Sequence, residues 1–232
     1  MADSKSGPKP TFINDIVTPV GRVSFPHLAE PDRKGPGKPY ADDKFKASLL
    51  LPKTGTDFST LRAKALECAQ TAFGPGIKSL NDFAHPFRDG NNRTNKDGEV
   101  MPGYADTLYI TCKSKDRPLV IDRAKANLDP KEVYGGCKAR FIVTAMSYVS
   151  TENVKQPNGQ VKKETIRGVT FLLDVVQKTG DDTAFGGGGK AKSVAALPDD
   201  LDEGGPPAAG YQDGAGPEEV TESDAEKALF GG

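Results

Sequence analysis

The stretch CKARFIVTAMSYVSTENVKQPNGQVKKETIRGVTFLLDVVQK, residues 137–178, reads as two long strands joined by a turn. Between Ala139 and Ala145, small and apolar residues alternate with larger or polar ones, which is the pattern of a strand with one buried face. The last third is apolar on both faces, and the Pro-Asn-Gly sequence between the two strands is typical of a hairpin turn. Gly168, inside the second strand, predicts a bulge or a sharp bend of the kind that curls a sheet.

Three further segments have the composition of strands. Residues 11–25 predict a bent or edge strand, because Pro19 and Gly21 interrupt an otherwise β-favouring run. KFKASLLLP, residues 44–52, alternates between an apolar face and a basic face. DTLYITCKSK, residues 106–115, alternates in the same way. The chain therefore has about five strands.

One segment has the period of a helix instead. In TDFSTLRAKALECAQTAFGPG, residues 56–76, small and apolar side chains recur every three or four positions. Thr56 or Asp57 can cap the start, and the Gly-Pro pair after the last apolar residue ends the helix. Polar loops are expected at 26–42 and at 81–104, and the second mixes aromatic with basic residues. Loops of that length are usually functional or disordered.

This element count predicts a mainly β fold, a five-stranded OB-fold barrel with one packing helix. The hairpin that joins the last two strands and the bend at Gly168 fit such a barrel, and a two-sheet sandwich is the alternative. We expect the OB-fold domain to cover residues 11–180. A disordered N-terminus, residues 1–10, precedes it, and a Gly-rich hinge with an acidic disordered tail, residues 181–232, follows it.

The charge changes sign at this expected boundary. Residues 1–180 contain 28 Lys and Arg against 20 Asp and Glu, whereas residues 181–232 contain 3 against 12. A basic body with an acidic tail is typical of proteins that handle polyanions, although the tail could simply aid solubility. The sequence FGGGGKAKS at 185–193 lacks the G-x-x-x-x-G-K-[ST] spacing of a phosphate loop, because Ala184 and Ala191 stand at two of its defining positions. The glycine run therefore predicts a hinge.

Cysteine and histidine usage gives little support for a metal site, a cofactor site or catalysis. Cys68, Cys112 and Cys137 are far apart, and His27 and His85 each lie beside a proline. No C-x-x-C or H-x-E pattern occurs, and free thiols suit a reducing compartment. The N-terminus has no signal-like apolar region, and no run reaches the roughly 18 apolar residues of a membrane span. We expect an intracellular protein that needs no cofactor and is not an enzyme.

Aromatic and basic residues share the outer face of two expected strands, which favours single-stranded nucleic acid as the ligand. Unpaired bases offer faces for stacking, and phosphates require cations. Ordinary barrel packing and solvated lysines are the simpler explanation for any one of these residues. The residues expected to bind are Tyr109, Lys113, Lys115, Arg140 and Tyr148 on the strands, Lys44 and Lys46 as a weaker extension, and Arg88, Arg93 and Tyr104 from the loop, closing over the strand.

Two other functions are compatible with the sequence. The carboxylates of the 82–104 loop, Asp89, Asp97 and Glu99, could hold Mg²⁺ in a nuclease or recombination enzyme. A structural or adaptor protein with an incidental basic face is the other alternative. Duplex recognition is not favoured, because the one expected helix looks like a packing helix and has no row of base-reading side chains.

Several runs also resemble a known family. HPFRDGN (85–91), PGYADTLYITCKSKDRPLVID (102–122), YGGCKARF (134–141) and VTFLLDVVQKTGDD (169–182) resemble phage single-stranded DNA-binding proteins of the OB fold, a family formerly known only as a domain of unknown function. The closing order of strand, TAFGGGG and acidic tail is similar to the helix-destabilising proteins of short-tailed coliphages. The resemblance covers roughly residues 12–189.

The resemblance implies sequence-nonspecific binding of single-stranded DNA in phage replication, recombination and repair, in the cytoplasm of the infected bacterial host. It also implies that the acidic tail contacts the polymerase and the helicase-primase and competes with DNA, with Phe230 as the terminal aromatic; self-association is left open. The tail differs from the coliphage pattern, since Lys227 and two final glycines lie near its end. Tyr148 matches one of two coliphage stacking aromatics, and the other falls near Ser150.

Overall fold

The computed structural model describes residues 9–35, 41–155 and 161–185. Within these ranges the chain forms eight strands, one α-helix and three short 3-10 turns. The elements are β1 (Phe12–Val17), β2 (Gly21–Asp32), β3 (Lys44–Pro52), α1 (Ser59–Phe73), η1 (Leu80–Asp82), β4 (Phe87–Asp89), η2 (Gly90–Asn92), β5 (Thr107–Ser114), β6 (Leu119–Ile121), η3 (Pro130–Glu132), β7 (Lys138–Lys155) and β8 (Val161–Gly180). Residues 1–8 and 186–232 lie outside the described part, and with them most of the expected N-terminal segment and tail.

Five of the strands close into a ring in the order β2, β3, β5, β8, β7 and back to β2. Every pairing in the ring is antiparallel except β5 with β8, which run parallel where Lys113 meets Leu172. The ring closes where Gly21 of β2 pairs with Ala139 of β7. A closed five-stranded ring with this Greek-key order is an OB-type barrel, which confirms the expected fold and excludes the two-sheet sandwich.

The N-terminal segment forms two strands and not one bent strand. β1 and β2 both pair with β7, at Phe12↔Met146 and Gly21↔Ala139, on either side of the interruption at residues 18–20. β2 then continues to Asp32, so the prediction of a loop at 26–42 was wrong for residues 26–32. The register of β2 shifts between Ser24 and His27, around a proline, and proline is tolerated in a sheet at such irregular positions.

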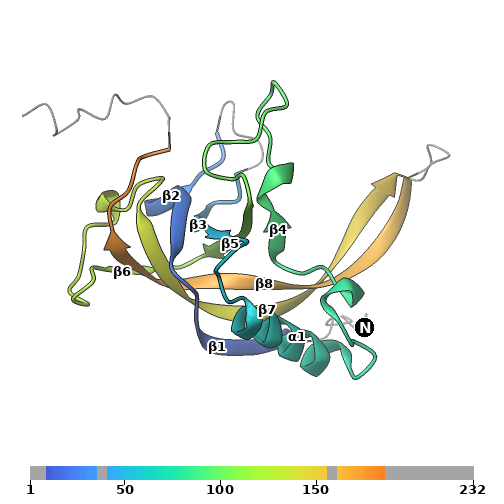
Figure 1. Cartoon of the computed structure of the whole chain (residues 1–232). Helices are drawn as coiled ribbons and strands as arrows, with labels where there is room; N and C mark the ends of the chain where they lie inside the picture. The colour runs from blue at the N-terminus through green and yellow to red at the C-terminus, as the bar shows by residue number, and fades with distance from the viewer. Residues whose placement is uncertain (1–8, 36–40, 156–160, 186–232) are drawn as a thin grey trace, which may run out of the picture. The chain divides into compact units, whose positions relative to one another are not determined.

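The two long C-terminal strands form the expected hairpin. β7 and β8 pair from Lys138↔Gly180 outward to Lys155↔Val161, and the expected turn at 156–160 lies outside the described residues. Figure 1 shows the outer ends of both strands extending past the barrel as a two-stranded arm. The predicted bulge at Gly168 was wrong, because the register is regular there and the nearest irregularity falls between Ile142 and Val143.

Helix α1 covers one end of the barrel, as its period predicts (Figure 1). Leu61, Ala65 and Cys68 on its inner face are fully buried, and the helix packs on β1, β7 and β8. The carboxylate of Asp57 accepts a hydrogen bond from the first helical N–H at 2.8 Å, and Gly74 follows the last turn. No helix among the described residues has the length and apolarity that crossing a bilayer would require.

Two of the strands were not expected. β4 pairs with β5, so the segment at 81–104 is partly ordered by the barrel and is not one long loop. Residues 93–101 form a small hairpin with a bridge between Thr94 and Val100. β6 adds to the free edge of β8. Both unexpected strands have only three residues, which is too short for an alternating pattern to be recognised.

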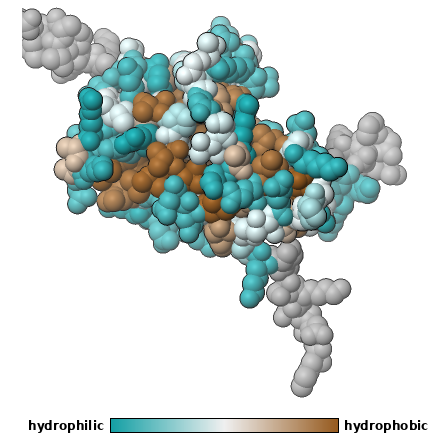
Figure 2. All heavy atoms as spheres, turned by 60° about the horizontal axis from the view of Figure 1, so that its bottom comes forward, coloured by the Kyte–Doolittle hydropathy of each residue, from teal (hydrophilic) through white to brown (hydrophobic). Residues whose placement is uncertain are grey.

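The face at the bottom of Figure 1 exposes apolar side chains among polar ones (Figure 2). β1 runs along this side and is the first strand in the sheet order. Phe12 and Val17 of β1 are exposed apolar residues, with exposed fractions of 50% and 49%. The core itself lies inside the ring and under α1, where residues such as Leu49, Phe141 and Phe171 are fully buried.

Candidate nucleic-acid interface

Strands β2, β3 and β5 present a polar floor on one outer face of the barrel. Cross-strand partners project on the same side of an antiparallel sheet. Lys46 of β3 is paired with His27 on one side and with Lys113 on the other. Two residues further along β3, Ser48 is paired with Thr111, and their hydroxyls are 2.9 Å apart in a hydrogen bond. The alternation expected for 44–52 and 106–115 therefore places these polar groups together.

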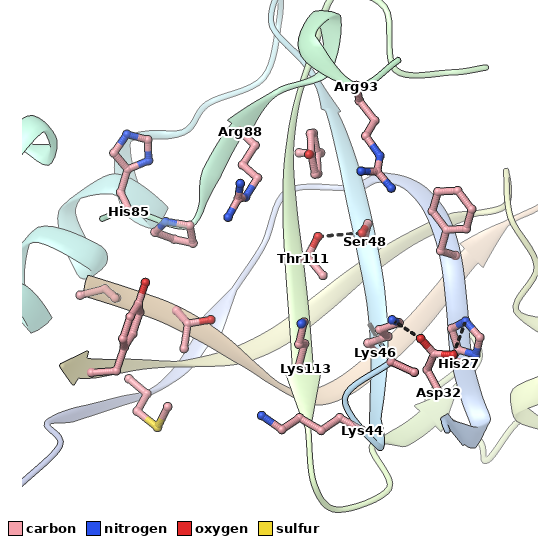
Figure 3. Close-up of a pocket in the computed structure, with 18 of the residues that line it drawn as sticks. His27, Asp32, Lys44, Lys46, Ser48, His85, Arg88, Arg93, Thr111 and Lys113 are labelled. Carbon is pink, nitrogen blue, oxygen red and sulfur yellow. Dashed lines mark hydrogen bonds and ion pairs between the residues drawn. The ribbon is translucent and has the colours of Figure 1, made fainter. Parts of the chain in front are cut away.

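A groove of about 910 Å³ lies over this floor (Figure 3). Its lining residues come from β2, β3 and β5, from the segment of β4, from Arg93 and Tyr104 beyond it, and from β7 and β8. The residues that line it are Phe25, His27, Asp32, Ala41, Lys44, Lys46, Ser48, His85, Pro86, Arg88, Arg93, Tyr104, Tyr109, Thr111, Lys113, Met146, Tyr148, Val169 and Thr170. Eight of the ten residues expected to bind are among them.

The groove is strongly cationic, with five Lys and Arg side chains against one carboxylate among its lining residues. Arg88 and Arg93 make no ion pair within the described ranges, and Figure 3 shows the Arg93 side chain extending toward Ser48. A hollow lined by one sign of charge concentrates ligands of the opposite sign. The groove is therefore suited to a polyanion, with two arginines available for phosphate groups.

Two of the groove lysines are already held by carboxylates. Lys46 forms an ion pair with Asp32, and Lys113 contacts Asp42 at 2.6 Å. Partial burial tends to raise the pKa of Asp42, but the hydrogen bond and charge of Lys113 outweigh it, and that pKa lies below its usual value. The second carboxylate oxygen of Asp42 is buried and has no hydrogen-bond partner among the described residues. These carboxylates fix the two ammonium groups at the floor and reduce the net charge that a phosphate meets.

Tyr104 supports the groove and does not close over it. Its side chain is only 2% exposed, and its hydroxyl donates to the Ser24 hydroxyl at 3.2 Å. Burial raises its pKa, although the hydrogen bond with Ser24 opposes this. The Tyr104 ring stands edge-on to Tyr109, with centroids 5.1 Å apart and planes at 78°. Tyr104 was expected to close over the bound strand from the loop; the structure buries it against Tyr109 at the edge of the groove, and its part in binding stays a prediction.

Phe25 is a groove residue that the sequence interpretation missed. It lies at the irregular point of β2, its φ is +48°, and its exposed fraction is 46%. A bulky residue in the left-handed region is uncommon, and such strained positions are enriched at functional sites. The Phe-Pro pair at residues 25–26 was the available signal, because proline inside a strand marks a bulge that re-aims its neighbour.

Tyr148 reaches the groove from β7 and lies against Gly168 of β8. The two are direct cross-strand partners, and a Cβ atom built on Gly168 would be 2.4 Å from Cζ of the tyrosine. The missing side chain thus makes room for the ring. Ala84 bridges to the same glycine and brings His85 to this end of the groove, where its Nδ1 atom is buried with no hydrogen-bond partner in the described part of the chain.

Arg140 and Lys115 lie away from the groove. The Arg140 guanidinium donates to the Gln177 side chain at 2.7 Å, and both residues line a second, smaller hollow together with Arg123. Lys115 is exposed in the bend after β5. The structure therefore separates these two cations from the other expected residues, and their part in binding stays a prediction.

The loop carboxylates do not gather as a metal site would require. Asp89 pairs with Lys53 at 2.8 Å, and it also accepts the Asn91 N–H at 2.9 Å. Glu99 accepts from the Asn95 side chain at 3.3 Å. Across the described ranges, no three His, Cys, Asp or Glu side chains are grouped so that they could hold a metal ion. Asp89 and Glu99 are thus each engaged by side-chain or backbone groups close to them.

Comparison with known proteins gives a family match and a similar curated protein. Residues 14–204 match the family model described as the ssDNA-binding protein of Enterobacter phage Enc34. "Putative protein p50" of Acyrthosiphon pisum secondary endosymbiont phage 1 is 30% identical over 176 residues, which cover 73% of this chain and 85% of that protein. The matched family consists of DNA-binding proteins that are not enzymes.

Solved structures of two phage proteins are also similar. The single-stranded DNA-binding protein from bacteriophage Enc34 is 20% identical, with a TM-score of 0.44 over 80% of this chain and 89% of that one. Gp2.5, a single-stranded DNA-binding protein encoded by bacteriophage T7, is 12% identical, with a TM-score of 0.43 over 82% of this chain and 97% of that one. On the family match, which spans most of its length, the chain belongs to the Enc34 family of phage single-stranded DNA-binding proteins.

Proposed function

We propose that this protein coats single-stranded DNA without strong sequence preference during phage DNA replication, recombination and repair. One observation carries the proposal: the groove places the rings of Phe25, Tyr109 and Tyr148 beside arginines that no described carboxylate neutralises. Rings offer stacking surfaces to any base, and arginines bind any phosphate. Membership of a family of single-stranded DNA-binding proteins supports this reading.

The same groove accounts for a preference for single strands over duplex. Stacking on a ring requires an unpaired base, and each stacked base contributes about 1–3 kcal/mol. Each phosphate contact on a single strand adds about −0.7 to the slope of log K against log salt concentration. Base-specific readout in a duplex would require a helix or ribbon in the major groove, and α1 instead lies with its apolar face on the barrel.

The second part of the proposed function, regulation of DNA binding and recruitment of partners, belongs to the acidic C-terminal segment. Residues 181–232 contain 12 Asp and Glu against 3 Lys and Arg, so they resemble a polyanion in charge. We assign to this segment competition with DNA for the basic groove, and recruitment of the phage polymerase and helicase-primase through Phe230. The glycines at 186–189 act as its hinge. This division into an OB-fold domain and a regulatory tail rests on composition and on the charge reversal at Gly180.

A gel shift with matched single-stranded and duplex oligonucleotides tests the function. The protein, incubated at low salt with and without Mg²⁺, should retard the single strand, leave most of the duplex free, and leave both intact. Cleavage of the single strand in Mg²⁺ would favour the nuclease alternative. Failure to shift either DNA at low salt would favour an adaptor role and contradict the proposal.

A further inference from the structure

The five residues that follow β8 lie against the barrel, although their composition belongs to the acidic tail. We name Asp181–Phe185 the strap. The backbone N–H of Phe185 donates to the carbonyl of Gly135 at 2.9 Å. The hydroxyl of Tyr134 donates to the carbonyl of Asp182 at 3.0 Å. The strap is thus bound to the barrel through its backbone at both ends.

Arg22 of β2 binds the strap through its guanidinium group. Its guanidinium lies over the ring of Phe185, with Cζ 4.2 Å from the centroid. The same side chain donates to the carbonyls of Gly136, at 3.1 Å, and Thr183, and lies 3.7 Å from the Asp182 carboxylate. A planar guanidinium can stack and donate at the same time, which an ammonium group cannot do.

The seat of the strap is made of glycines. A Cβ atom on Gly103 would be 2.1 Å from Cε1 of Phe185, and one on Gly136 would be 2.3 Å from the Thr183 carbonyl oxygen. Both glycines have positive φ values, +79° and +113°, so the backbone conformation and the contact each favour glycine. The ring of Phe185 therefore fills a fitted position on the barrel.

This seat is directly connected to the groove. Gly103 precedes Tyr104, whose N–H donates to the carbonyl of Met101 at 3.0 Å to close the turn. Tyr104 is buried and stands edge-on to Tyr109 at 5.1 Å. Two contacts and one peptide bond thus lead from Phe185 through Gly103 and Tyr104 to Tyr109, a ring on the groove surface.

We propose that Phe185 is a positioning residue for the groove: its ring holds the Met101–Tyr104 turn, and through Tyr104 it fixes Tyr109 in the orientation that stacks a base. This inference rests on the proposed function. It adds a role for a residue that itself lies outside the groove, and it makes the strap a working part of the binding domain.

The test compares full-length Phe185→Ala with wild type and with Phe12→Ala, a control that removes an exposed phenylalanine from β1. Phe185→Ala should weaken single-strand binding by about 2- to 30-fold, the range for coupling through intervening residues. Amide hydrogen exchange should become faster in residues 101–109 and stay unchanged in the β7–β8 hairpin. Phe12→Ala should change neither quantity.

A double-mutant cycle with Tyr109→Ala separates positioning from a general loss of stability. If Phe185 acts through Tyr109, adding Phe185→Ala to Tyr109→Ala should cause little further loss of affinity. Arg22→Lys keeps the positive charge but loses the planar guanidinium, and it should loosen the same turn. Additive losses, or unchanged exchange in residues 101–109 in every variant, would overturn the inference. A wild-type protein that binds no single strand would instead defeat the proposed function, while the exchange data still decide whether Phe185 holds the turn.

Discussion

The ring of Tyr148 occupies the space above Gly168, where a Cβ atom would lie 2.4 Å from Cζ of the tyrosine. The two residues face each other across β7 and β8, so the smallest residue of one strand lies beneath an aromatic ring of the other. Gly168, from which the sequence predicts a bulge, instead leaves the space that the Tyr148 ring fills beside the groove.

Gly168→Ala should displace the ring and weaken single-strand binding. Gly76→Ala, at a site with open space around it, is the control for a glycine substitution alone. Equal binding by both variants, measured by fluorescence anisotropy, would contradict this role.

Removal of the ring itself should have a larger effect. Tyr148→Ala is expected to cost about 1–3 kcal/mol of binding free energy, the range for one stacked base. Val149→Ala is the matched control, because Val149 is the next residue on the same strand, is 42% exposed and does not line the groove. Titration of a labelled single-stranded oligonucleotide measures both, and a Tyr148→Ala protein with wild-type affinity would remove Tyr148 from the site.

The carboxylate of Asp42 should limit the affinity of the groove. Asp42→Asn releases Lys113 from its ion pair, so binding should become tighter and the salt dependence steeper, by about 0.7 in slope if one phosphate contact is gained. Asp116→Asn removes the same charge from an exposed bend nearby and should have a smaller effect. Affinity measured at several salt concentrations distinguishes them, and identical slopes in the two variants would contradict the assignment.

Because of the Asp42 carboxylate, the stability of the folded protein should depend on pH in the acidic range. Because the folded-state pKa of Asp42 is lowered, its contribution to stability is present above the unfolded-state pKa, about 3.9, and is lost as pH falls through the lower folded-state value. Asp42→Asn lacks this contribution and should lose less stability than wild type below about pH 4. Circular dichroism during acid titration measures the difference, and parallel curves for both proteins would be the contrary result.

The C-terminal segment should weaken DNA binding. A chain that ends at Gly189 should bind single strands more tightly than the full chain, with a difference that shrinks at high salt, because charge competition is screened. A full-length variant with the carboxylates after Gly189 changed to amides should match the truncated chain. If that variant binds like wild type, the acidic charge is not what weakens DNA binding.

The five-stranded ring and the polar floor of the groove could be predicted from the sequence. Alternation in 44–52 and 106–115 places Lys46 and Lys113 on one face, and the barrel then makes their strands neighbours. Arg140 and Tyr148 also share a face of one strand, but eight residues separate them, about 26 Å along a strand that curves around a barrel. Alternation assigns a face and cannot show how the strand curves, so the sequence could not show that Arg140 lies away from the groove residues.

Other site features depend on contacts between segments far apart in the sequence. Phe25 faces the groove only because the register of β2 shifts beside Pro26, and periodicity alone gives no such shift. Tyr104 was expected on the surface because its segment reads as a polar loop. Its burial results from packing against Ser24 and Tyr109, from two other strands.

Photocrosslinking most directly tests the central claim that single-stranded DNA lies in the groove. A single-stranded oligonucleotide with photoreactive thymines would be irradiated with the full-length protein, and the adducts mapped by mass spectrometry. Adducts are expected at Phe25, Tyr109 and Tyr148. Adducts confined to the second hollow around Arg123 and Arg140, with none on the groove rings, would contradict it.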